Sequence, residues 1–238
     1  MPNEKFMRAA LSLAKKGLGR TSPNPAVGAV VVKGKKIVAR GYHRKAGLAH
    51  AEVEALDRAG RKSSGADLYV TLEPCCHHGR TPPCTDAIIE ARIKRVFVGM
   101  KDPNPGVRGR GIKKLMAAGI TVVTGMLESD CRTLNEPYTK HVTTGIPYVI
   151  LKLAMSLDGR IATGGGESKW ITGPEARNYV HKLRNTVDCV MVGSGTAVRD
   201  DPRLTVRFSN GRNPARAVVD TKLVTPPGAR IFSSPSNN

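Results

Sequence analysis

The feature that most constrains the fold of this chain is a group of potential metal ligands, His50, Cys75 and Cys84. His50 begins an expected helix, Cys75 follows an expected strand, and Cys84 begins a second helix. One nitrogen and two thiolates suit a tetrahedral zinc ion, and three protein ligands leave a fourth position for water. A chain that binds zinc through all three must therefore bring two helix starts together at the end of a strand.

Glu52 follows His50 by two positions, so the two side chains do not share a helix face. We interpret Glu52 as a proton carrier beside the metal-bound water and not as a fourth ligand. The pair His50-Glu52, followed by Pro74-Cys75, resembles the motif of zinc-dependent nucleobase deaminases. One difference is that eight residues separate Cys75 from Cys84, where that motif has two.

Other metal ligands are available close by. Cys76, His77 and His78 could compete for the ion, and a closed structural site of Cys75, Cys84 and either Cys76 or His78 is the alternative. A closed structural site would not require His50 and Glu52 at the start of a helix. The five cysteines are odd in number, and three of them lie within ten positions, which is not the pattern of a disulfide framework.

Strand-like and helix-like segments alternate along the first part of the chain and predict an α/β sandwich. The sheet should be largely parallel after an opening hairpin. The expected strands are 27–32, 37–42, 66–72, 95–100 and 120–124. A first helix is expected around Phe6 and Leu13, and further helices are expected over residues 50–59 and 85–91, over a segment around Ile112, and over residues 127–141. Pro137 should disturb the last of these helices.

Residues 143–147 are the expected linker, which gives domains 1–145 and 146–238. The second domain should begin with a strand over 148–155. Thr172 and Glu175 predict a capping box for a helix that buries Ala176, Tyr179, Val180 and Leu183. Further strands are expected at 188–193 and 217–220, so this segment reads as the first part of a domain.

The net charge of +19 is spread along the chain and favours phosphate-bearing partners, although a general compositional bias would produce the same excess. No apolar run is long enough to span a bilayer, and the charged residues 1–16 do not form a signal peptide. We therefore expect a cytoplasmic protein with no membrane partner.

Several motifs together resemble the bifunctional deaminase/reductase family of riboflavin biosynthesis. They are PNPAVG (23–28), HAE (50–52), EPCCHHGRTPPC (73–84), KDPNP (101–105), KLAMSLDGR (152–160), ESKWIT (167–172) and DDPRLT (200–205). The long segment between the two cysteines is characteristic of that family. The resemblance implies a cytidine-deaminase-like three-layer α/β/α sandwich followed by a partial dihydrofolate-reductase-like α/β domain.

The resemblance implies that the first domain hydrolyses the 2-amino group of a diaminopyrimidinone that carries a phosphoribosylamino arm. Zinc would activate water, while Glu52 would protonate the ring nitrogen and then the departing ammonia. Asn24, His43, Asp102 and Asn104 would hold the base and ribose, and His77, Gly79, Arg80 and Thr81 would bind the phosphate. Turn formation beside proline is the alternative role for Asn24 and Asn104, and a structural strand-end histidine is the alternative for His43.

The resemblance also implies that the second domain passes hydride from NADPH to the ribose carbon. Contacts to the cofactor would come from Ala154, Trp170, Thr196 and Asp200, and contacts to the substrate from Ser168, Arg184, Leu204 and Arg207. The alternatives are a core aromatic for Trp170 and a solvated helix face for Arg184. Because the family's later glycine-rich loop for the cofactor phosphates is absent here, we expect deaminase activity without reductase activity.

Two other functions are consistent with parts of the sequence. A transfer-RNA base deaminase would share the zinc ligands and Glu52 and would suit the positive charge, but aromatic residues for base stacking are only 4% of the chain. In a non-enzymatic, zinc-stabilised RNA-binding module, Glu52→Ala would change neither the zinc content nor the function. We expect a phosphorylated pyrimidine as the ligand, no nucleic-acid partner, and, from the family, a homo-oligomer.

Overall fold

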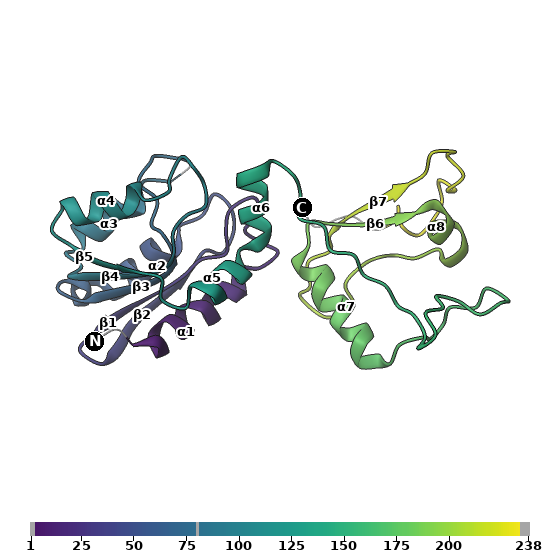
Figure 1. Cartoon of the computed structure of the whole chain (residues 1–238), viewed down its shortest axis with the longest axis horizontal. Helices are drawn as coiled ribbons and strands as arrows, with labels where there is room; N and C mark the ends of the chain where they lie inside the picture. Colours follow the sequence, from purple (N-terminus) through teal and green to yellow (C-terminus); the bar gives the residue numbers. More distant parts are fainter. Residues whose placement is uncertain (1–2, 80, 234–238) are drawn as a thin grey trace. The chain divides into compact units, whose positions relative to one another are not determined.

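The computed structural model of the chain describes residues 3–79 and 81–233, which form two compact units, residues 1–149 and 150–238 (Figure 1). Within the described residues, every helix is too short or too polar to cross a membrane.

The first unit contains a five-stranded sheet in the order β2-β1-β3-β4-β5. Its β1 pairs antiparallel with β2 and β3, whereas β3, β4 and β5 run parallel, as predicted. The elements are α1 (Glu4–Ala14), η1 (Lys15–Gly17), β1 (Gly28–Lys33), β2 (Lys36–Tyr42), α2 (Ala51–Ala59), η2 (Gly60–Ser63), β3 (Asp67–Leu72), α3 (Cys84–Glu90), β4 (Arg95–Met100), α4 (Arg110–Ala117), β5 (Thr121–Thr124), α5 (Glu128–Leu134) and α6 (Glu136–Thr144).

Helices cover both faces of this sheet. Helices α1 and α5 contact one face, while α2 and α4 contact the other, with α3 between them (Figure 1). Two glycines on opposite faces allow the closest approaches. A Cβ atom at Gly28 would overlap the Ala10 carbonyl oxygen in α1, and one at Gly41 would overlap the Ala51 carbonyl oxygen in α2. The predicted three-layer sandwich is confirmed.

The expected single helix over residues 127–141 is wrong. The structure has two helices, α5 and α6, which separate at Asn135. Pro137 lies in the first turn of α6, where its missing N–H costs nothing. The Asn135 side chain is buried and clamps Ala26, since its Oδ1 accepts the Ala26 N–H at 2.8 Å and its Nδ2 donates to the Ala26 carbonyl at 3.0 Å. The proline therefore starts a helix at a position where we expected it only to disturb one.

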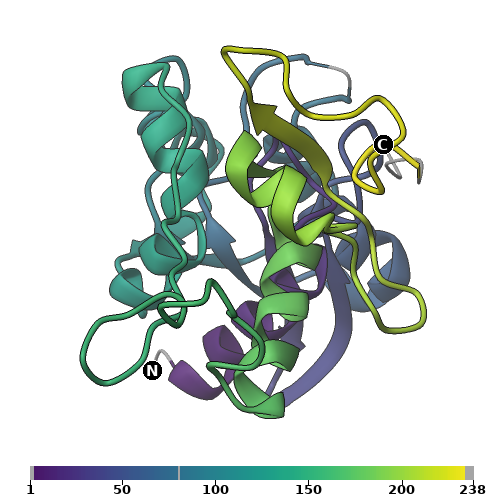
Figure 2. The ribbon, with the colours of Figure 1, turned by 90° about the vertical axis from the view of Figure 1, so that its right-hand side faces the viewer.

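Over its described residues, 150–233, the second unit forms a two-stranded parallel sheet and two helices. Its elements are α7 (Pro174–Thr186), β6 (Cys189–Gly193), α8 (Ser194–Asp200) and β7 (Ala215–Val219). Between α6 and α7 the chain is irregular (Figure 2), so the strand expected over 148–155 is not formed. A strand needs a neighbour to satisfy its main-chain groups, and the sheet of this unit comprises β6 and β7 alone among the described residues.

Two details of α7 also differ from the prediction. Gly173 is the N-cap residue and no side chain caps the helix, so the expected Thr172–Glu175 capping box is not formed. The predicted apolar face of α7 contains no fully buried residue, and Tyr179 is exposed. The small core of this unit is instead formed by Leu204, Ala229 and Ile231 against β6 and β7.

Candidate active site

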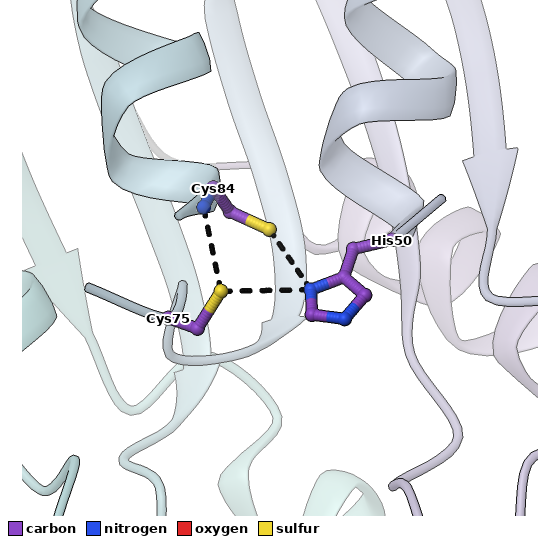
Figure 3. A group of neighbouring side chains, drawn as sticks. All are labelled: His50, Cys75 and Cys84. Atoms are coloured by element: carbon purple, nitrogen blue, oxygen red, sulfur yellow. Dashed lines mark hydrogen bonds between the residues drawn. The ribbon is translucent and has the colours of Figure 1, made fainter. Parts of the chain in front are cut away.

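Side chains from three separate segments of the first unit converge at the start of α2 (Figure 3). His50 is the N-cap residue of α2, Cys75 follows β3, and Cys84 is the first residue of α3. The His50 Nδ1 atom lies 3.1 Å from Cys84 Sγ and 3.5 Å from Cys75 Sγ. The Cys84 main-chain N–H donates to Cys75 Sγ at 3.3 Å. The fold thus brings one strand end and two helix starts together.

These separations fit a tetrahedral zinc site. With Zn–N and Zn–S bonds of about 2.0 and 2.3 Å, a nitrogen and a sulfur on one ion lie about 3.5 Å apart. The ligand atoms of His50, Cys75 and Cys84 all lie within 4.8 Å of one another, the one such group in the described part of the chain. Cys76 and His78 do not join it, so the alternative closed site lacks its ligands.

Hydrogen bonding divides the charge unequally between the two thiols. A hydrogen bond from the Cys84 thiol, supported by His50 and the Cys84 main-chain N–H, lowers the pKa of Cys75 to about 4. The same hydrogen bond, together with burial, raises the pKa of Cys84 well above its ordinary value. Metal binding displaces thiol protons, so a divalent cation would favour the thiolate form of both. The two helix N-termini favour negative charge here as well.

Glu52 lies in the first turn of α2 with 4% of its surface exposed. Burial raises the pKa of Glu52 to about 7, although the positive charge of His50 acts in the opposite direction. A carboxyl group with a pKa near neutral can take up and return a proton in one catalytic cycle. Its position outside the three-ligand group suits a proton carrier and not a metal ligand.

A cavity of about 370 Å³ opens beside these residues, within the usual range for small-molecule sites. The fold gathers nearly all predicted deaminase residues around it. The predicted residues in its lining are Asn24, His43, His50, Glu52, Cys75, His77, Gly79, Thr81, Asp102 and Asn104. Cys84 is fully buried, and Arg80 lies outside the described residues.

Asn24 and His43 form a pair in one wall of the cavity. The His43 Nδ1 atom lies 3.1 Å from the Ala49 carbonyl oxygen, to which it donates as an N–H. Burial lowers the pKa of His43, so the ring is neutral and its Nε2 accepts from the Asn24 amide nitrogen at 3.1 Å. The Asn24 carbonyl oxygen is thereby oriented by the pair.

Asp102 and Asn104 lie in the loop between β4 and α4. Asp102 Oδ1 accepts the Asn104 N–H at 2.8 Å, and Asn104 Oδ1 accepts the Gly106 N–H at 2.9 Å. The alternative turn role of Asn104 is therefore present, but it uses the carbonyl oxygen and leaves the amide nitrogen to face other partners. Burial raises the pKa of Asp102.

Two lining residues with polar side chains, Glu73 and Tyr138, are among those that lie outside the predicted set. The Glu73 carboxylate is buried and accepts four main-chain N–H groups, from Asp102, Gly109, Gly111 and Ile112, at 3.0–3.3 Å. It anchors the loop that carries Asp102 and Asn104. A glutamate directly after a buried strand is a signal that could have indicated this anchor. Tyr138 comes from α6, and no sequence motif marks it.

Three described residues between Cys75 and Cys84, namely His77, Gly79 and Thr81, also line the cavity. His77 and Gly79 are exposed, while Thr81 Oγ1 lies 3.4 Å from His50 Nε2. The segment thus places Thr81 beside the metal ligands and leaves His77 and Gly79 accessible to a ligand from solvent.

The predicted reductase residues lie in varied surroundings within the second unit. Trp170 is 66% exposed, with the Arg177 guanidinium 4.3 Å from its ring centroid, so it is not a core aromatic. Arg184 is partly buried and donates to the Thr205 carbonyl at 3.1 Å, so it is not simply a solvated helix residue. Leu204 belongs to the core.

The remaining reductase residues differ in exposure. Ala154 and Ser168 are half-buried, while Thr196, Asp200 and Arg207 are exposed. Burial, and then the charge of Arg207, lower the pKa of Arg184. The two guanidinium groups therefore repel each other, and the substrate contacts expected of Arg184 and Arg207 stay a prediction.

Comparison with known proteins accounts for both units. Residues 1–100 match the cytidine and deoxycytidylate deaminase zinc-binding region, and residues 147–237 match the RibD C-terminal domain. The chain is 53% identical to the riboflavin biosynthesis protein RibD of Aquifex aeolicus over 98% of its own length and 65% of that protein. It is 48% identical to RibD of Escherichia coli, over 99% of its own length and 68% of that protein.

Solved structures agree with these matches. A deaminase/reductase from Thermotoga maritima superposes with a TM-score of 0.93 at 49% identity, covering 98% of this chain and 67% of that one. RibD of Acinetobacter baumannii gives a TM-score of 0.91 at 45% identity with the same coverage. The chain thus spans 65% and 68% of the length of the two curated relatives described above. The chain belongs to the RibD family of riboflavin biosynthesis proteins.

Proposed function

We propose that this chain hydrolyses the 2-amino group of 2,5-diamino-6-(5-phosphoribosylamino)pyrimidin-4(3H)-one, releasing ammonia and the corresponding aminouracil. The observation that carries the proposal is the placement of buried Glu52 beside the His50, Cys75 and Cys84 group in one cavity. That cavity belongs to a chain whose relatives are named as riboflavin biosynthesis proteins.

A zinc ion held by His50, Cys75 and Cys84 would acidify a water molecule and so supply a nucleophile near neutral pH. Glu52 would take one proton from the attacking water and give it to the ring nitrogen next to the amino-bearing carbon, as the water oxygen bonds to that carbon. Glu52 would then move the proton of the added hydroxyl group to the amino group, so that the C–N bond breaks, ammonia leaves and the carbonyl of the product forms. A carboxyl group whose pKa is about 7 suits both transfers.

The walls of the cavity are suited to a polar heterocycle with a phosphorylated arm. Asn24, Asp102 and Asn104 offer hydrogen-bonding groups to the base and ribose, and His43 fixes Asn24. The exposed segment with His77, Gly79 and Thr81, next to Arg80 in sequence, is the proposed phosphate contact. Because these groups lie at the cavity edge, the arm can remain near solvent while the base is enclosed.

One observation favours a second candidate, a deaminase of transfer-RNA bases, namely the net charge of +19. The two are separated by following ammonia release from the diaminopyrimidinone phosphate and from a transfer-RNA anticodon stem-loop, with the zinc-loaded chain. We expect release from the pyrimidine alone. Release from the RNA alone would overturn the proposal.

A further inference from the structure

Tyr138 is the cavity residue whose role is least explained by the zinc chemistry. It comes from the first turn of α6, far in sequence from the zinc ligands, yet it lines the same cavity. Its hydroxyl donates to Asp102 Oδ1 at 3.1 Å. The side chain is half-buried, and desolvation raises the pKa of Tyr138, so the hydroxyl keeps its proton and remains a donor.

The Tyr138 hydroxyl completes the hydrogen bonding of one Asp102 oxygen. Asp102 Oδ1 accepts from both the Tyr138 hydroxyl and the Asn104 N–H. For Oδ2, the described part of the chain supplies no hydrogen-bond donor, although Asp102 lines the cavity. The two donors therefore fix the rotation of the carboxylate and leave Oδ2 as an acceptor for a ligand.

The position of Tyr138 is itself supported by hydrogen bonds between the start of α6 and the segment that carries Asn24. Asn135, immediately before α6, exchanges two hydrogen bonds with the main chain of Ala26. Ala26 directly follows Pro23, Asn24 and Pro25, which line the cavity. The Asn135–Ala26 hydrogen bonds thus fix the start of α6, which carries Tyr138, relative to the cavity segment that carries Asn24.

The matched families indicate what this wall does. The match to the general zinc-binding deaminase region ends at residue 100, before Asp102, Asn104 and Tyr138. The match to RibD proteins extends over 98% of the chain. The residues that supply metal ligands and proton transfer therefore lie in the general region, while the Asp102–Tyr138 wall lies in the part outside it.

We propose that Tyr138 is a positioning residue for substrate recognition, holding Asp102 so that its Oδ2 accepts a hydrogen bond from an N–H or O–H group of the pyrimidine ligand. This inference rests on the proposed deaminase function. Because a fixed acceptor contributes equally to the bound substrate and to its transition state, its loss raises KM and leaves kcat nearly unchanged.

The test compares Tyr138→Phe with Tyr148→Phe in the zinc-loaded full chain. Both changes remove one hydroxyl, but the Tyr148 hydroxyl donates to Glu136 on the exposed surface at 2.9 Å. For Tyr138→Phe we expect KM for the diaminopyrimidinone phosphate to rise about tenfold with kcat within about threefold. Tyr148→Phe should match the wild type.

The KM values of Asp102→Asn and of the double variant test whether Tyr138 acts through Asp102. Asp102→Asn should raise KM, and adding Tyr138→Phe to it should change KM by less than about twofold, because the tyrosine acts through Asp102. Unchanged KM in Tyr138→Phe, additive effects in the double variant, or loss of zinc or cooperative melting in Tyr138→Phe would each overturn the inference.

Calorimetric binding of the deaminated aminouracil phosphate separates this inference from the proposed function. If the wild type releases no ammonia, the proposed function fails, yet a roughly tenfold weaker Kd in Tyr138→Phe would still support the role of Tyr138. Equal Kd values, or no binding by the wild type, would contradict it.

Discussion

At the scale of single residues, Glu73 shows how a buried charge can serve a site without touching the reaction. Within the described part of the chain its carboxylate has no cationic partner, and it is instead neutralised by hydrogen bonds from four main-chain N–H groups. Hydrogen bonds to an ionised group are stronger than those between neutral groups. Glu73 thereby links the segment that leads into Cys75 to the loop that carries Asp102 and Asn104.

Replacing Glu73 with Gln should destabilise the first unit. The glutamine amide nitrogen cannot accept the N–H groups that one carboxylate oxygen now accepts, which leaves buried donors unpaired. We expect the free energy of unfolding to fall by about 2–3 kcal/mol, measured by urea denaturation followed by circular dichroism. The exposed Glu90 is the matched position, and Glu90→Gln should have no measurable effect. Equal stabilities of the two variants would contradict the anchoring role.

At the scale of elements, the close packing of α2 on β2 determines where His50 and Glu52 lie. Gly41 in β2 lies directly under the first turn of α2, and a side chain there would overlap the main chain of Ala51 and contact Ala55. Because Gly41 has no Cβ atom, the start of α2 can pack closely on β2, and this packing positions His50 and Glu52.

Gly41→Ala should consequently impair both stability and metal binding. A methyl group in this contact forces α2 away from the sheet, at a cost of about 1–3 kcal/mol in the free energy of unfolding. Zinc content measured by atomic absorption after dialysis should fall along with stability. Gly195→Ala is the control, since a Cβ atom there meets nothing within 4 Å. Full zinc content and stability in Gly41→Ala would show that the helix can shift without harm.

The zinc ligands and the order of the elements could be predicted because they depend on local patterns. Cys75 follows a strand and Cys84 begins a helix, and the parallel strands β3 and β4 confirm the alternating pattern. Tyr138 could not be predicted, since it reaches the cavity through the Asn135 clamp on Ala26, a contact between distant segments. The expected strand 148–155 was wrong because a β-rich sequence forms a strand only beside a partner.

At the scale of the whole molecule, the two units differ in the completeness of their cores. The first has a five-stranded sheet covered on both faces, whereas the described second unit has a two-stranded sheet. Many large apolar side chains of the second unit are exposed, among them Leu151, Leu153, Leu157 and Ile161. Exposed apolar groups of this number indicate a core that these residues do not close by themselves.

We therefore predict that these 238 residues do not carry out the NADPH-dependent step that the family resemblance implies. With the deaminated aminouracil phosphate and NADPH present, absorbance at the nicotinamide band should stay constant while the same preparation releases ammonia from the deaminase substrate. Oxidation of NADPH that depends on the aminouracil phosphate would contradict this prediction and show that the second unit is functional.

The role of Glu52 as proton carrier is tested most directly by ammonia release from the diaminopyrimidinone phosphate, measured for the wild type, Glu52→Gln and Glu54→Gln, each with its zinc content determined. Glu54 lies on the same helix but pairs with Arg44 and Arg58. We expect equal zinc content in all three proteins, normal ammonia release by Glu54→Gln, and a loss of at least about a hundredfold in Glu52→Gln. Undiminished release by zinc-loaded Glu52→Gln, or none by the zinc-loaded wild type, would contradict it.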